Sequence, residues 1–192
     1  GILQGSFIFN LNKCFGDISL FDVIQIEDYK EKITSFICNK DCIRHHVTDI
    51  IILAPIPNPR SLRDAYAFRQ HVETSRKNRG LDMIAEFDKF PVFYFSNHNA
   101  IFADQEEIEL MPDHFDKLDY ELELAIVIGK GGRNILAKNA DEHIAGFCIL
   151  NDLSGRTLQM EEMKLNLGPV KGKDFASILG PYLVTADELK EQ

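Results

Sequence analysis

The sequence lacks the features that mark several functional classes. Acidic residues outnumber basic ones by 30 to 21, which gives a formal net charge of −9, and the clustered basic face of a duplex-binding protein is missing. No apolar run approaches the roughly 20 residues that span a bilayer. The first residues have neither the basic start nor the apolar stretch of a signal peptide. We therefore expect a cytoplasmic protein that binds neither nucleic acid nor a membrane.

Cysteine is scarce, and it forms no complete metal-binding pattern. Cys38 and Cys42 make a C-x3-C pair, and the sequence has no second such pair. A zinc site would need His45 and His46 as further ligands. Reduced, mostly buried thiols are the favoured interpretation.

The glycine-rich loops of nucleotide-binding proteins are missing as well. Residues 129–133 (GKGGR) lack the spacing of a dinucleotide fingerprint, and we interpret them as a hairpin turn. Residues 168–175 (GPVKGKDF) lack the spacing of a phosphate loop. In this second segment small residues let the backbone approach a ligand, and a lysine beside them can hold a carboxylate or enolate oxygen.

What is present indicates one sizeable core. The chain has 192 residues, of which 45% are hydrophobic. Many strands and few helices, without a regular alternation of the two, predict a β-rich α+β fold. Strands are predicted over residues 6–11, 49–54, 91–96, 120–128, 145–151 and 178–184, and helices over the later part of 20–38 and over 61–79.

A proline-rich connection divides the predicted fold. It covers residues 55–59 and predicts a small N-terminal subdomain, residues 1–58, before a main domain, residues 59–192. Residues 185–188 (TADE) read as a capping box that opens a helix. Because the chain stops soon afterwards, we expect a further C-terminal part.

A pair of carboxylates at the start of an apolar strand is the strongest local signal. Glu121 and Glu123 point to the same face, because side chains alternate across a strand. Two carboxylates entering a core repel each other, and a hard cation with oxygen ligands resolves that conflict. The alternative is a solvated face that carries both glutamates.

A second signal follows the next apolar strand. The strand ends in Asn151–Asp152, and Arg156 and Gln159 come soon after it. Asp152 can complete a carboxylate cluster, and Arg156 and Gln159 meet on one face if the turn is helical. The alternative is an ordinary turn that Asp152 caps.

A third signal lies in the helix predicted over residues 61–79. Asp64 and His71 are separated by roughly 700° at about 100° per residue, which places them on one helical face. They can serve as ligand and general base, or form an ordinary pair on a helix surface. His98 and His114 lie in loop-like sequence and are predicted to be surface residues.

Four segments together resemble the fumarylacetoacetate hydrolase superfamily. Residues 119–130 (DYELELAIVIGK) resemble its D-x-E-x-E-L-A-x-V-I-G-K strand, and residues 146–159 its G-[YF]-x-x-x-N-D-x-S-x-R-x-x-Q segment. Residues 171–175 resemble its G-K-[SN]-F loop, and residues 180–181 its G-P edge. The resemblance implies a mixed β-sandwich roll that forms a homodimer.

The resemblance also implies roles for single residues. It makes Asp64, Glu121, Glu123 and Asp152 the ligands of Mg²⁺ or Ca²⁺, with Mn²⁺ as an alternative, and His71 the catalytic base. By the same resemblance, Lys173, Arg156 and Gln159 act on the reacting substrate, and Tyr66 and Ser177 contact it. The acid that orients the histidine belongs, in the family, to a more C-terminal part.

The activity that follows from the resemblance is hydrolysis of a carbon–carbon bond in a small keto acid. The substrate would be a 1,3-diketo acid of the fumarylacetoacetate or acylpyruvate type. The same metal site, which stabilises an enolate, would also support decarboxylation, tautomerisation or isomerisation of a 2-keto acid. A third reading is a non-catalytic binding protein that a metal stabilises.

Overall fold

The computed structural model describes residues 1–39 and 42–191. A mixed sheet of five strands forms its centre, and the longest strand, β9 (Ile144–Asp152), has neighbours on both sides. β8 (Leu122–Ile128) pairs antiparallel along one side of β9. β11 (Ser177–Leu179) and β12 (Val184–Thr185) follow each other along the other side. β6 (Ile101–Phe102) extends the sheet by a parallel pairing with β11.

Four smaller elements gather at the carboxyl end of β9. β10 (Ser154–Gly155) pairs with β7 (Leu118–Asp119), and α6 (Arg156–Met163) begins directly after β10. The short helix α5 (Pro112–Phe115) precedes β7 and lies against α6 and β10. This end of the sheet therefore gathers several chain segments around the carboxyl end of β9.

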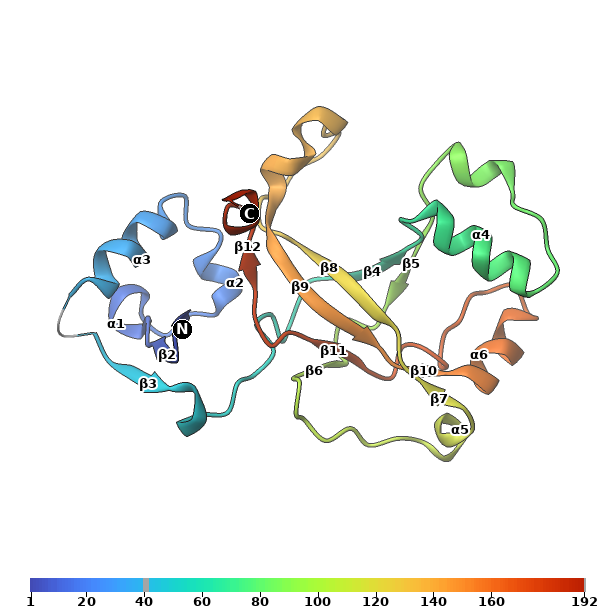
Figure 1. The fold of residues 1–192 in the computed structure, drawn as a ribbon, viewed down its shortest axis with the longest axis horizontal. Helices are drawn as coiled ribbons and strands as arrows, with labels where there is room; N and C mark the ends of the chain where they lie inside the picture. Colours follow the sequence, from blue (N-terminus) through green and yellow to red (C-terminus); the bar gives the residue numbers. More distant parts are fainter. Residues whose placement is uncertain (40–41, 192) are drawn as a thin grey trace.

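A separate two-stranded sheet precedes β6 in the chain. β4 (Leu62–Ala65) pairs antiparallel with β5 (Phe93–Ser96), and α4 (Arg69–Asn78) and the 3-10 helix η2 (Ala85–Asp88) lie between them in sequence. In Figure 1 the helices α4 and α6 lie on the right, beyond the ends of β8 and β9.

The N-terminal residues form a compact unit of their own. β1 (Ile2–Gln4), β2 (Phe7–Phe9) and β3 (Arg44–His46) make an antiparallel sheet, seen on the left in Figure 1. The accompanying helices are α1 (Asn12–Phe15), α2 (Leu20–Val23) and α3 (Tyr29–Ile37), and the 3-10 helix η1 (Val47–Asp49) follows β3. Leu11, Val23 and Ile33 form the buried apolar cluster of this unit.

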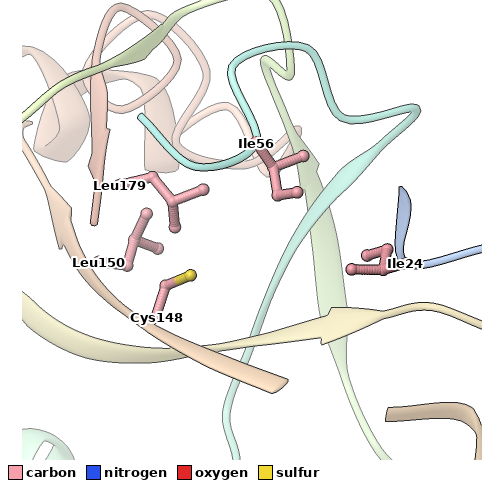
Figure 2. Close-up of a cluster of buried hydrophobic side chains, with 5 residues drawn as sticks. All are labelled: Ile24, Ile56, Cys148, Leu150 and Leu179. Carbon is pink, nitrogen blue, oxygen red and sulfur yellow. The ribbon is translucent and has the colours of Figure 1, made fainter. Parts of the chain in front are cut away.

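The main apolar core lies on one face of the central sheet. Figure 2 shows Cys148 and Leu150 of β9 and Leu179 of β11 turned toward Ile56, with Ile24 at the margin of the same cluster. Each of the five is less than 10% exposed. The cluster explains why β9 forms, since alternate apolar side chains along a strand bury one face. Ile24 comes from the N-terminal unit, so the cluster ties that unit to the sheet.

The mixed α+β architecture agrees with the fold class expected from the sequence, and the predicted strands at 120–128, 145–151 and 178–184 are confirmed. Two predicted elements are wrong. Residues 49–54 are not a strand, because residue 49 ends the 3-10 helix η1 and residues 50–54 pair with no described strand. Residues 61–79 are not one helix, because residues 62–65 pair with β5 and the helix begins only at Arg69.

Two further expectations are modified. The predicted turn at residues 129–133 is the start of a longer connection between β8 and β9, which includes the 3-10 helix η3 (Ala137–His143). The helix expected after residue 185 is a short 3-10 helix, η4 (Glu188–Glu191). No helix within the described ranges is long and apolar enough to cross a membrane.

Candidate metal centre

Three carboxylates from separate strands meet beside the central sheet. Asp64 comes from β4, Glu123 from β8 and Asp152 from the end of β9, and one oxygen of each lies within 4.8 Å of the others. Asp152 is only 3% exposed. Its Oδ1 is buried and has no hydrogen-bond partner among the described residues. An unpaired buried carboxylate oxygen beside two further carboxylates fits a hard divalent cation, which takes oxygen ligands.

The electrostatics of this cluster favour bound positive charge. Burial, together with the nearby charges of Asp64 and Asp152, raises the pKa of Glu123 to about 7. Burial raises the pKa of Asp152 to about 6, although Lys173 opposes the shift. Without a cation the centre therefore keeps protons near neutral pH, because its carboxylates repel each other in a partly dehydrated place.

The pKa shifts predict that metal binding weakens as the pH falls. A cation must displace the protons of Glu123 and Asp152, so affinity should fall on the order of 10²- to 10³-fold between pH 8 and pH 5. Titration calorimetry with Mn²⁺ or Mg²⁺ at several pH values measures this. A pH-independent affinity would contradict the prediction.

The same pKa shifts predict the direction in which folding stability changes with pH. Both folded-state pKa values lie above the ordinary values of 4.5 and 3.8. The folded metal-free protein thus binds more protons than the unfolded chain between about pH 4 and pH 7, and its unfolding free energy falls as the pH rises through that window. Thermal unfolding in EDTA at pH 5 and pH 8 should show the higher Tm at pH 5.

Glu121, predicted as a fourth ligand, is engaged elsewhere. Its Oε2 lies 2.9 Å from Nζ of Lys173, and its Oε1 accepts a hydrogen bond of 2.5 Å from Arg156. Burial would raise its pKa, but hydrogen bonds and charges from Lys173 and Arg156 hold that pKa below the ordinary value. Glu121 therefore borders the three-carboxylate cluster as part of an ion-pair network.

Lys173 has an ammonium group that lies against the carboxylates of the centre. Its side chain is 3% exposed, and its Nζ donates to Oδ2 of Asp152 at 2.5 Å. Burial would lower the pKa of Lys173, but Asp152 and Glu121 raise it above the ordinary value. The centre thus holds an ammonium beside the carboxylates, where it can stabilise negative charge on a bound oxygen.

The side chains of Arg156 and Gln159 meet on a helix, as their three-residue spacing predicted. Both lie on α6, and Nη1 of Arg156 donates to Oε1 of Gln159 at 3.1 Å. Nε of Arg156 also donates to Oδ2 of Asp119 at 2.8 Å. The guanidinium therefore links β7, Glu121 and α6 at the edge of the centre.

Tyr94 is a member of the centre that sequence reasoning missed. It lies opposite Asp64 in the β4–β5 pairing, and its hydroxyl donates to Oδ2 of Asp152 at 3.4 Å. Burial and the charge of Asp152, followed by a hydrogen bond with Asp64, raise the pKa of Tyr94 far above its ordinary value. The sequence gives no single signal for it, because residues 93–96 read only as an aromatic strand.

Three further predicted residues are not members of the carboxylate cluster or of its ion pairs within the described chain. His71 is exposed on α4 and makes no hydrogen bond or ion pair within the described ranges. It does not share a helical face with Asp64, which lies on a strand. Tyr66 is 52% exposed just beyond β4. Ser177 is 2% exposed and is the register partner of Asp152 in the sheet.

The prediction that His114 is a surface residue is wrong. Its side chain is 1% exposed, and its ring stacks on Phe175 with centroids 3.9 Å apart. Its Nε2 lies 3.1 Å from the carbonyl oxygen of Lys171. Loop-like sequence hid this burial because Lys171 and Phe175, which cover the ring, lie far away along the chain.

The zinc alternative receives no support in the part of the chain that the structure describes. All four cysteines are free thiols, and none joins a group of metal-ligand atoms. Cys148 is buried, as expected, but Cys38 is exposed and the other two are half-buried.

Comparison with known proteins finds a matching family model and similar proteins. The family model described as "Fumarylacetoacetate (FAA) hydrolase C-terminal" matches residues 61–192. Maleylpyruvate hydrolase of Aquipseudomonas alcaligenes is 31% identical over 156 residues, which is 78% of this chain and 52% of that protein. An oxaloacetate tautomerase of Bacillus subtilis is 31% identical over 150 residues, 77% of this chain and 47% of that protein. The chain thus spans about half the length of these relatives.

Solved structures show the same fold. Fumarylacetoacetate hydrolase from psychrophilic Exiguobacterium antarcticum has a TM-score of 0.67 and 28% identity, covering 96% of this chain and 61% of that one. Maleylpyruvate hydrolase from Sphingobium sp. SYK-6, in complex with manganese(II) and pyruvate, has a TM-score of 0.67 and 16% identity, covering 97% and 64% of the two chains.

Proposed function

Because the chain belongs to the fumarylacetoacetate hydrolase family, we propose that it is a metal-dependent enzyme that cleaves a carbon–carbon bond in a 1,3-diketo acid of the fumarylacetoacetate or acylpyruvate type. The observation that carries this proposal is the partly buried cluster of Asp64, Glu123 and Asp152 with the ammonium of Lys173 at its edge. Likeness to a maleylpyruvate hydrolase supports it.

The three carboxylates would hold Mg²⁺, Ca²⁺ or Mn²⁺, and Glu121 would join them only by leaving its ion pairs. When bound, the cation would supply Lewis acidity toward substrate oxygens. Lys173 would then stabilise negative charge on a substrate oxygen, with Arg156 and Gln159 orienting the substrate beside it. Tyr66 and Ser177 remain proposed substrate contacts. A homodimeric assembly is also part of the proposal.

His71 is the proposed general base. It would take a proton from water, whose oxygen attacks the distal carbonyl carbon. The carbon–carbon bond then breaks, and its electron pair passes to an enolate that Lys173 stabilises. The proton returns from His71 to the enolate carbon, and the products are two acids. Histidine suits the role because it gains and loses a proton near neutral pH.

Replacement of His71 tests this role. His71→Ala should lower kcat on a diketo acid on the order of 10²- to 10⁴-fold, because a general base contributes that much. Metal affinity by calorimetry should stay unchanged, since His71 lies outside the carboxylate cluster. His98→Ala is the matched control and should keep full turnover. Full turnover of His71→Ala would show that His71 is not the base.

A second candidate function is tautomerisation, decarboxylation or isomerisation of a 2-keto acid. Two observations favour it: His71 is exposed and unbonded among the described residues, and an oxaloacetate tautomerase is among the relatives. Such reactions require the same metal and lysine but no hydrolytic water. The third reading, a non-catalytic metal-stabilised protein, requires folding rather than turnover to depend on the metal.

Product analysis separates the three. The protein is incubated with acylpyruvates, fumarylacetoacetate or oxaloacetate, with Mg²⁺ and with EDTA. Metal-dependent release of pyruvate or acetoacetate together with a matching acid supports hydrolysis. CO₂ release or enol–keto exchange of oxaloacetate alone would replace hydrolysis by the second function. No turnover, with EDTA lowering only the Tm, would support the binding protein.

A further inference from the structure

Glu162 holds the backbone that leads to the buried lysine. The carboxylate of Glu162, on α6, accepts hydrogen bonds from two successive amides of the following loop. Its Oε1 lies 2.9 Å from the amide nitrogen of Lys171, and its Oε2 lies 2.9 Å from that of Gly172. Charged acceptors make stronger hydrogen bonds than neutral ones, and two parallel bonds also fix orientation.

The carbonyl groups of the same two residues are held from the other side. The carbonyl oxygen of Lys171 accepts from Nε2 of His114 at 3.1 Å, and that of Gly172 accepts from the amide of Gly155 at 2.8 Å. A carbonyl can only accept, so Nε2 of His114 carries the proton. The His114 ring also stacks on Phe175, and it therefore touches the chain on both sides of Lys173.

Close packing leaves this loop segment no room for a side chain at its centre. A Cβ on Gly172 would stand 2.6 Å from the amide nitrogen of Gln159 and 2.7 Å from its Cα. The loop therefore lies directly against α6. All four polar backbone groups of residues 171–172 are bonded, an arrangement that restrains the next residue strongly.

We propose that Glu162 and His114 are positioning residues, which fix the backbone of residues 171–172 so that the ammonium of Lys173 stays against Asp152 and Glu121. The effect on catalysis rests on the proposed function. The effect on the loop does not, because it follows from the hydrogen bonds alone.

Glu162→Gln tests the proposal with little change in volume. The substitution turns one acceptor oxygen into an NH₂ group that faces a backbone N–H, so one of the two bonds is lost. Glu161→Gln is the matched control. Glu161 is the preceding residue on α6, is exposed, and pairs only with Lys164 within the described chain.

Hydrogen exchange measures the loop without any substrate. In Glu162→Gln, peptides covering residues 169–175 should exchange about 10-fold faster, while peptides of β9 should keep their wild-type rates. Glu161→Gln should match the wild type in both regions. Unchanged exchange in residues 169–175, or equal acceleration in β9, would overturn the proposal.

Kinetics then measure the consequence for Lys173. A small displacement of a charge-stabilising group lowers kcat, so Glu162→Gln should lose about 10- to 100-fold in kcat, with KM within about 3-fold. In a Lys173→Met background the same substitution should cost nothing further, because it acts through Lys173. If the kcat loss of the double variant equalled the product of the two single losses, Glu162 would have a merely structural role and the proposal would be overturned.

His114→Phe provides a second variant. Phenylalanine retains a ring to stack on Phe175 but removes the donor to Lys171, so loop exchange should accelerate as in Glu162→Gln. If the wild-type protein turned over no keto acid, the proposed function would fail, and the exchange rates would still decide whether Glu162 and His114 hold the loop.

Discussion

Lys173→Met should lower kcat by on the order of 10²- to 10³-fold, the usual cost of removing a group that stabilises charge in the transition state. Methionine keeps most of the length and the apolar stem of lysine, so the change isolates the ammonium. That ammonium lies 2.5 Å from Asp152 and 2.9 Å from Glu121, and no other lysine contacts either carboxylate within the described residues. Steady-state rates on the substrate found by product analysis measure the effect.

The same variant should also unfold more easily when no metal is present. Removing one partner of a buried ion pair leaves the other charge uncompensated, which costs about 3–5 kcal/mol. Lys164→Met is the control, because Lys164 is 67% exposed and pairs only with exposed Glu161. It should change neither rate nor Tm by a measurable amount. A Lys173→Met protein that turned over within about 3-fold of the wild type would remove Lys173 from the mechanism.

Glu123→Gln should move metal affinity and metal-free stability in opposite directions. The amide is a poorer ligand for a hard cation, so affinity for Mn²⁺ or Mg²⁺ should fall more than about 100-fold, which is the upper cost of changing a group that merely supports a ligand. The amide also relieves the repulsion that raises the pKa of Glu123 to about 7. In EDTA at pH 8 the variant should therefore have a higher Tm than the wild type.

Calorimetry and thermal unfolding measure these two effects on the same samples. Glu161→Gln again serves as the control and should leave both unchanged. Glu121→Gln distinguishes a ligand from a member of the ion-pair network: a ligand would lose affinity as Glu123→Gln does. If Glu123→Gln lowered the Tm in EDTA and kept its metal affinity, Glu123 would be a structural residue and not a ligand.

The parts of the site that were predictable from sequence lie on regular strands and on one helix. Alternation along residues 121–128 placed the two glutamates toward one face, and the structure has both half-buried there. Asp152 was predictable because a polar pair ends an apolar strand. Arg156 and Gln159 were predictable from their three-residue spacing on a helix, and they form a hydrogen bond.

The parts that were not predictable depend on pairings between distant segments. Asp64 has a helix-like neighbourhood in sequence, but pairing with β5 makes it a strand residue, because tertiary contacts override weak local propensity. Tyr94 reaches Asp152, and His114 reaches the carbonyl of Lys171, through contacts between segments that lie far apart in the chain. No local period or spacing contains that information.

Which of the two glutamates stays unpaired in the carboxylate cluster was likewise beyond the sequence. Both satisfy the E-x-E pattern, but Lys173 and Arg156 neutralise Glu121 and leave Glu123 unpaired beside Asp64 and Asp152. The difference arises because Lys173 and Arg156 follow β9 and are brought back to β8 by the antiparallel pairing. A strand pattern predicts a face, whereas the ion pairs on that face depend on the whole sheet.

Anomalous diffraction from crystals soaked in millimolar Mn²⁺ at pH 8 tests the central claim most directly. We expect one strong peak within coordination distance of oxygens from Asp64, Glu123 and Asp152, close to the buried Oδ1 of Asp152 that has no partner in the described chain. The peak should vanish in crystals of Glu123→Gln. A peak elsewhere, or none at this cluster, would contradict a metal centre built from these three carboxylates.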